Sequence, residues 1–449
     1  MLRHYILTPT FALITLIWFL VSAIPFMGPL VLDTLLVLLI VFAFIDRIDF
    51  ATLKRDRFYL LMLLQYPIWN IFRNYLGGGG AEISDTGPEG YQMWLFSILA
   101  IVLVFWFFNR VEITTKRLSL IIYASVCTTF AVSCYFYFEL GQCRVVLWNP
   151  NVFSAPMFVS VLVIIALCLN TGDMKFKFHA MPLLVISLVT SLAFAGARGI
   201  FVGQVISFSI AAIIFLTKRE TLKFWGVLLS ILLGILGTLA VESYSGCNNF
   251  GRLRALGDVF NLTKLEHTKL EVKLASIHAK FDFTDQSNVF ATIPQSSAGS
   301  DIRNANVLQL NQARPIEDVF ADTSMQLRWK IWAQAIDKIK DQPLWGSGAA
   351  NDRAQTTQAH PHVHNMYLSW LIWGGVFGLV SGLVFLFANV SSAFLENRPV
   401  IGIGVSLMFA IFWASSMLFD SFLRWEHYTY VFIIYSVIIQ RCVAKRLVN

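Results

Sequence analysis

Residues 224–241 read FWGVLLSILLGILGTLAV, an unbroken and almost wholly apolar run. As a helix rising about 1.5 Å per residue, such a run covers ~27 Å, close to the ~30 Å hydrocarbon core of a bilayer. Similar runs recur along the chain, 57% of the residues are hydrophobic, only 14% are charged, and the mean hydropathy is +0.65. The sequence therefore predicts an all-α polytopic membrane protein, because helices satisfy their own backbone hydrogen bonds in lipid.

The apolar runs and the charges between them predict about twelve transmembrane helices with both chain ends in the cytoplasm. The first four predicted spans lie near 7–25, 29–45, 58–72 and 92–109. The fifth ends near 138, the sixth begins near 154, the seventh lies at 181–196 and the eighth begins near 199. The last four lie at 224–241, 363–389, 400–419 and 428–440. The segments assigned to the inside hold 17 Lys and Arg residues, and the short outside loops hold four. This asymmetry follows the positive-inside rule and accounts for the net charge of +7.

One long polar segment divides the chain into three predicted domains. Residues 1–241 carry transmembrane helices 1–9, residues 242–362 form a large, partly helical periplasmic segment, and residues 363–449 carry helices 10–12 and a cytoplasmic tail. Within the segment, 324–336 has apolar residues at helical spacing, and Pro343 with the glycines after it stops that helix. Cys143 and Cys247 both fall in predicted outside loops, and the sequence leaves open whether they form a disulfide.

Three alternating histidines, His360, His362 and His364, lie where the polar segment meets helix 10. A histidine at a helix N-terminus tends to be neutral and usable as a base. A capping or headgroup-facing role for His364 is the alternative. Three histidines can also bind zinc, but Pro361 interrupts their geometry and no acidic partner is nearby in the sequence, so we expect no metal and no cofactor.

Two arginines are candidates for binding an anion. Arg198 lies between glycines at the outer end of predicted helix 7, and Arg328 lies on the helix of the polar segment. The arginine fork suits a diphosphate, and the alternatives are an arginine at the membrane interface and a solvated surface charge. No nucleotide-binding loop, dinucleotide fingerprint, HExxH or Asp-x-Asp motif is present, which disfavours ATP-driven transport and transfer from nucleotide sugars.

Four motifs, taken together in this order, resemble a known family. They are Asn149-Pro150-Asn151, Thr190-Ser191 through Ala197-Arg198-Gly199, Ser324–Trp332 with Pro343 and Gly346-Ser347-Gly348, and His362-Val363-His364-Asn365 with Gly374, Gly375 and Gly378. The series covers about residues 140–400 and resembles the O-antigen ligase and polymerase superfamily of bacterial inner membranes. Ala197 stands where that family usually has serine. Any role that the serine hydroxyl has in the family is therefore in doubt for this chain.

The resemblance implies a membrane glycosyltransferase that works at the periplasmic face of the bacterial inner membrane. The expected donor is a glycan on undecaprenyl diphosphate, the expected acceptor is a lipid A–core hydroxyl, and the transfer is expected to be metal-independent and inverting, with no nucleic acid partner. His364, Arg328 and Arg198 are the expected catalytic residues. Expected substrate-binding residues are Asn365, His362, Asn149 and Asn151.

Within the superfamily, the single large outside segment favours a ligase. An O-antigen polymerase that joins lipid-linked repeat units and a protein O-oligosaccharyltransferase are the alternatives. A lipid-linked sugar transporter is expected to carry charges within its spans, and Asp33 is the main such charge here.

Overall fold

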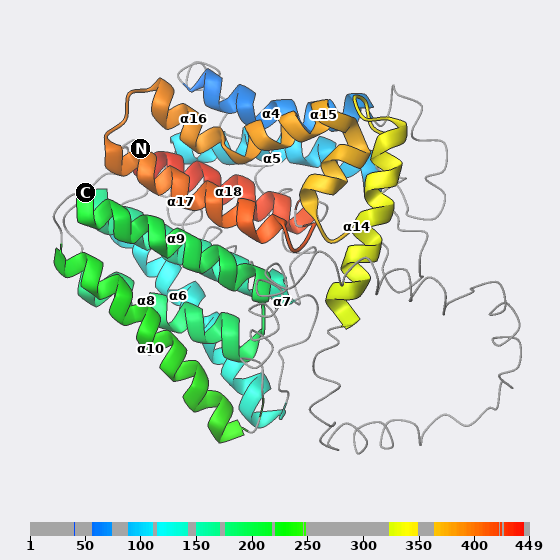
Figure 1. Cartoon of the computed structure of the whole chain (residues 1–449). Coiled ribbons are helices and arrows are strands. Elements are labelled where there is room, and N and C mark those ends of the chain that lie inside the picture. The colour runs from blue at the N-terminus through cyan, green and yellow to red at the C-terminus, as the bar shows by residue number, and fades with distance from the viewer. Residues whose placement is uncertain are drawn as a thin grey trace, which may run out of the picture. The chain divides into compact units, whose positions relative to one another are not determined.

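The computed structural model describes residues 40, 56–73, 89–110, 115–141, 150–170, 176–217, 221–245, 247, 323–348, 363–421, 423 and 426–443. The helices are α4 (Arg57–Ile71), α5 (Glu89–Arg110), α6 (Thr115–Cys134), α7 (Pro150–Asn170), α8 (Phe176–Val189), α9 (Arg198–Thr217), α10 (Thr221–Ser245), α14 (Thr323–Asp341), α15 (Met366–Leu386), α16 (Ala388–Leu395), α17 (Val400–Met417) and α18 (Glu426–Val443). The π-helical turns η3 (Tyr135–Glu139) and η4 (Thr190–Phe194) extend α6 and α8. Figure 1 shows these elements in chain order.

The part of the chain that the structure describes is all-helical, as expected, and its helices are those of a multi-pass membrane protein. Five are long and apolar enough to cross a bilayer: Leu118–Glu139, Gly199–Thr217, Thr221–Ser245, Met366–Leu386 and Val400–Met417. Shorter apolar helices cover Trp94–Phe108, Ser154–Cys168, His179–Phe194 and Thr429–Arg441. Apart from residue 40, the first two expected spans lie outside the described residues, as does most of 242–362. The total of twelve spans, the three-domain division and the periplasmic segment therefore stay predictions.

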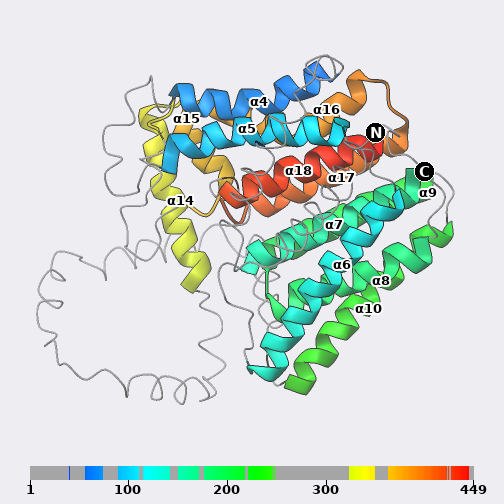
Figure 2. The same cartoon turned by 180° about the vertical axis from the view of Figure 1, so that it is seen from behind.

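Contacts divide the chain into two compact units, Gly251–Leu327 and the rest, and all helix contacts given below lie within the second of these. In it, α9 packs along α17, α10 along α8, and α4 against both α5 and α15. Figures 1 and 2 show α17 and α18 between α5 on one side and α9 on the other. The helices differ in burial. Helix α7 is buried throughout Ser154–Cys168, whereas α10 exposes Leu222, Trp225, Leu229, Leu232, Leu236 and Leu239. Such an apolar face suits hydrocarbon rather than water.

The expected helix 363–389 is divided in the structure. It begins only at Met366, ends at Leu386 and is followed by the separate helix α16. A break also lies inside α15, because Gly375 has φ +61° and ψ −150°, far from helical values. A residue other than glycine is strained at this φ, so the glycine permits the break.

The turn Pro343–Gly348, which follows α14, fills the break in α15. The backbone N–H of Ser347 donates to Ile372 O over 2.7 Å, and the backbone N–H of Val376 donates to Pro343 O over 2.9 Å. Backbone groups freed by the break therefore find partners within the protein, as they must in lipid. We call this contact between 343–348 and 372–376 the α14–α15 joint.

Two side chains from the end of α4 close over the joint. Arg73 is 8% exposed, and its Nε donates to Trp345 O over 2.6 Å while its Nη2 donates to Gly346 O. The Trp69 ring stacks on the Trp345 ring with centroids 6.1 Å apart. Arg73, which the topology places in an outside loop, thus binds carbonyl groups of the α14–α15 joint.

Replacing Gly375 by alanine should destabilise the protein more than replacing Gly141, which has the same φ of about +60°. A Cβ at Gly141 meets nothing within 4 Å, so Gly141→Ala carries only the torsional penalty of about 1–2 kcal/mol. A Cβ at Gly375 overlaps the Leu344 carbonyl, and the expected loss is roughly 3 kcal/mol or more. Thermal unfolding of the detergent-solubilised variants measures the difference. Equal midpoints would show that the close packing of the α14–α15 joint at Gly375 contributes nothing to stability.

Candidate functional site

A tight turn places Arg198 at the first residue of α9. Ala195 N donates to Thr190 O and Ala197 N donates to Ser191 O, both over 2.9 Å, and Gly196 reverses the chain with φ +59°. The π-helical turn η4 before it is an element often found near functional sites. The Arg198 side chain itself lies outside the described residues.

The start of α9 lies against the loop that follows α17. A Cβ on Gly199 would be only 2.9 Å from Phe419 Cβ, so only glycine permits this approach without displacement. Asp420 comes next in that loop, and its residue is 3% exposed. The backbone of Arg198–Gly199 and the segment Leu418–Ser421 are therefore neighbours.

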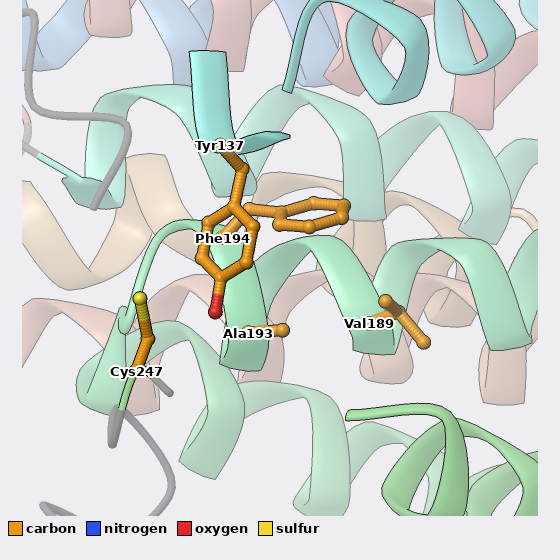
Figure 3. Close-up of a cluster of buried hydrophobic side chains, with 5 residues drawn as sticks. All are labelled: Tyr137, Val189, Ala193, Phe194 and Cys247. Atoms are coloured by element: carbon orange, nitrogen blue, oxygen red, sulfur yellow. The ribbon is translucent and has the colours of Figure 1, made fainter. Parts of the chain in front are cut away.

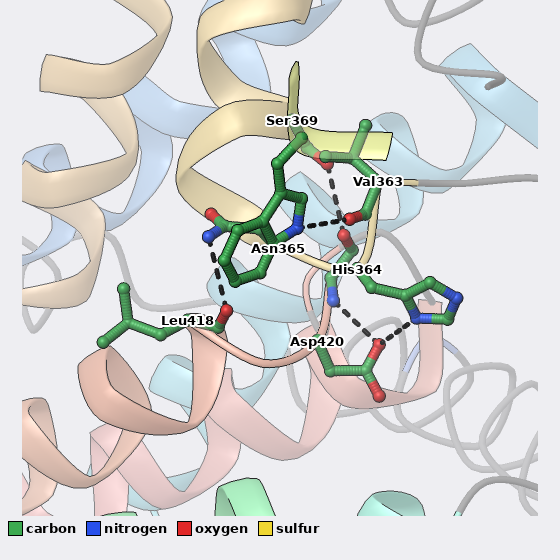
Figure 4. Close-up of polar contacts among 8 residues, drawn as sticks. Val363, His364, Asn365, Ser369, Leu418 and Asp420 are labelled. Carbon is green, nitrogen blue, oxygen red and sulfur yellow. Dashed lines mark hydrogen bonds and ion pairs between the residues drawn. The ribbon is translucent and has the colours of Figure 1, made fainter. Parts of the chain in front are cut away.

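Asn365 ties the start of α15 to the same loop. Its Oδ1 accepts hydrogen bonds from the backbone N–H groups of Tyr367 (3.0 Å) and Leu368 (3.1 Å), the geometry of an N-cap. Its Nδ2 donates to Leu418 O over 3.3 Å, as Figure 4 shows. Asn365 therefore fixes where α15 begins and how it faces the end of α17.

His364 precedes this cap and faces Asp420. Its φ of +54° lies in the left-handed region, and its Nδ1 is 3.7 Å from Asp420 Oδ1 (Figure 4). That separation is too long for a hydrogen bond but short enough for direct electrostatic attraction. The side chains are 19% and 4% exposed, and Asp420 Oδ1 also accepts from Ser421 N over 2.8 Å. The Asp420 carboxylate therefore faces Nδ1 of the ring rather than Nε2.

Helix α14 meets this segment through Trp332. Its Nε1 donates to the carbonyl of Val363 over 3.0 Å, directly before His364. Arg328 is partly exposed and lies one turn earlier on α14, on the same face as Trp332 because residues four apart are neighbours on a helix. The α14 turn that carries Arg328 is thus attached beside His364.

The structure brings together the backbone positions of Arg198, His364 and Asn365 around the loop after α17, and it brings the Arg328 turn of α14 to the same segment. His362 and Asn149 lie outside the described residues, as does the side chain of Asn151. The zinc alternative needs His360 and His362, so it stays untested. The roles assigned to all these residues stay predictions.

Asp420 is the functional candidate that the sequence reasoning missed. The predicted topology treated Asp420–His427 as an outside segment and used its charges only to assign sides of the membrane. The pair has a signal in the sequence. The carboxylate follows one apolar run, the histidine begins another, and both lie on the same predicted side of the membrane.

The helices suit a multi-pass membrane protein, and a histidine, a buried carboxylate and the arginine-bearing start of α9 lie together at one end of them. Residues 183–383 match the family described as O-antigen ligase, which supports the O-antigen ligase superfamily. The matched part runs from α8 into α15 and includes Arg198, Arg328, His364 and Asn365. The match confirms the resemblance found in the sequence, and it does not separate ligase from polymerase.

Enzymes of this family act on lipid-linked glycans. No curated protein matches the chain.

Replacing Asn365 by alanine should lower the free energy of unfolding by about 1–2 kcal/mol, because α15 loses its N-cap. Asn365→Asp retains an accepting oxygen for Tyr367 N and Leu368 N and should lose less than half as much. Thermal unfolding midpoints in detergent compare the two variants. An equal loss would show that the cap contributes little and that the bond to Leu418 O dominates.

Proposed function

We propose that the protein is an O-antigen ligase, a membrane glycosyltransferase that moves a glycan from undecaprenyl diphosphate to a sugar hydroxyl of lipid A–core. We place the reaction at the periplasmic face of a bacterial inner membrane. The observation that carries the proposal is the His364–Asp420 pair, held at the start of α15 beside the first turn of α9. The family match supports a reaction on a lipid-linked glycan.

His364 is the general base in this mechanism. Its Nε2 takes the proton from the acceptor hydroxyl as that oxygen attacks the anomeric carbon, and Asp420 stabilises the imidazolium that forms. Asp420 acts as a positioning residue, because it contacts the histidine and not the sugar. Separations of this kind often shorten when substrate binds, so 3.7 Å is compatible with the role.

Arg198 and Arg328 bind the diphosphate of the donor. The bond between the anomeric carbon and the diphosphate oxygen breaks while the new glycosidic bond forms, and undecaprenyl diphosphate leaves with the bonding electrons. The two guanidinium groups neutralise the charge that develops on the leaving group. Because the leaving group is already activated, the mechanism requires neither a nucleotide nor a metal, and direct displacement inverts the anomeric centre.

The remaining assigned residues contact the substrates. We assign His362, Asn365, Asn149 and Asn151 to substrate binding. For Asn365 such a contact is additional to its cap, because its Oδ1 already accepts two backbone hydrogen bonds.

A ligase is favoured over a polymerase because one large polar segment, 242–362, precedes the His364 junction. A polymerase or a protein O-oligosaccharyltransferase would use the same base and arginines with a different acceptor. A transporter is less favoured, because the charged pair that we describe lies at helix ends rather than along a path through the spans.

His364→Ala should lower the turnover of purified protein by about 10²–10⁴-fold, because general base catalysis contributes that much. Asp420→Asn should lower kcat on the order of 10²-fold and leave KM nearly unchanged, because it disturbs the orientation of His364 rather than binding. His179→Ala is the matched control, since His179 pairs with Tyr123 OH in the predicted inner half of the bundle. Full activity of His364→Ala would refute the mechanism.

The acceptor is identified by the lipopolysaccharide pattern of cells that lack the gene. A ligase predicts loss of the whole O-antigen ladder while the lipid-linked polymer accumulates. A polymerase predicts a core that carries one repeat unit. An unchanged ladder and no accumulated lipid-linked glycan would contradict both assignments.

A further inference from the structure

Cys247 lies two residues after α10, in a buried cluster at the end of the bundle. Its neighbours in this cluster are Tyr137, Val189, Ala193 and Phe194, as Figure 3 shows. Cys247 is disulfide-bonded, whereas three other cysteines of the described residues, Cys127, Cys134 and Cys168, are free. The chain has six cysteines, so only Cys143 and Cys442 remain as partners within the chain.

Cys442 is at the wrong end of the bundle to reach Cys247. It follows Arg441, whose guanidinium lies 5.8 Å from the Phe105 ring centroid near the end of α5. Helix α6 begins five residues after α5 ends, and it extends about 33 Å before Tyr137, at ~1.5 Å per residue. The Cα atoms of a disulfide are at most about 7 Å apart.

Cys143 is two residues beyond Gly141, the last described residue after η3. Tyr137 OH and Cys247 N both form hydrogen bonds with Ser245 Oγ, over 2.7 Å and 3.3 Å. The end of η3 and Cys247 are therefore neighbours. Two residues span at most ~7 Å, so Cys143 is at most that far along the chain from Gly141. We propose that Cys247 is bonded to Cys143, so that the bond joins the end of α10 to the loop between η3 and α7.

The proposed bond also assigns a compartment to this end of the bundle. Two thiols form one disulfide when a protein disulfide of the compartment takes up their two electrons and two protons and becomes a dithiol. Structural disulfides of this kind form in the periplasm and not in the cytosol of ordinary bacteria. Phe194 of the same cluster lies four residues before Arg198, so the Arg198 end of α9 faces the oxidising side. This compartment follows from the bond alone and depends on neither the enzyme's activity nor the charge bias of the loops.

The test counts free thiols by gel mobility after a polyethylene glycol maleimide has reacted with the denatured full-length protein. The wild type should label at four of its six cysteines without reductant and at all six after reduction. Cys143→Ser should label at five in both conditions, because it releases Cys247. The matched variant Cys442→Ser should label at three without reductant and five after reduction.

Six labels on the unreduced wild type, or release of Cys247 by Cys442→Ser, would overturn the pairing. A disulfide-linked dimer on a non-reducing gel would do the same. Cys143→Ser, Cys247→Ser and the double variant should share one thermal midpoint, several degrees below that of the wild type, since all three lack the same bond. The compartment is tested in cells without their periplasmic thiol oxidase, where the wild type should label at six. Unchanged labelling at four would contradict the assignment, whatever the transfer activity is.

Discussion

The α14–α15 joint is the contact on which the candidate site depends. A break inside an apolar helix leaves backbone groups without partners, and lipid offers none. The turn Pro343–Gly348 supplies them, and Arg73 closes the joint from α4. The contact holds the end of α14 at the middle of α15, while Trp332 holds an earlier turn of α14 at Val363. Two attachments fix the direction of α14 and so the position of Arg328 relative to α15.

The loop after α17 connects the other parts of the site. Leu418 O accepts from Asn365, Phe419 lies against Gly199, and Asp420 faces His364. Helix α9, helix α15 and His364 therefore all contact one short segment. Further hydrogen bonds, from Tyr367 OH to Ala414 O and between Ser369 Oγ and Ser421 Oγ, fasten α15 to this segment. A displacement of the end of α17 would alter all these relations together.

The sequence predicted the helical class, the approximate positions of most described apolar helices and the helix at 324–336, because hydropathy and helix stops are local properties. It did not predict the break at Gly375 or the partner of His364. The break depends on a turn about thirty residues earlier in the chain, and Asp420 is 56 residues from His364. Such pairings arise from packing between distant elements, which a single sequence does not record. Asn365 was predicted to bind substrate, and its cap became visible only with the φ and ψ angles around it.

The left-handed backbone at His364 bears on how this position is selected. A residue with a Cβ at φ +54° is strained by about 1–2 kcal/mol relative to glycine, although histidine tolerates the region better than most. If folding alone were under selection, glycine would be the better residue between Val363 and the helix cap. Under the proposed function, an imidazole there lowers stability but supplies a directed ring nitrogen, so homologues that had lost transfer activity should drift towards glycine at this position.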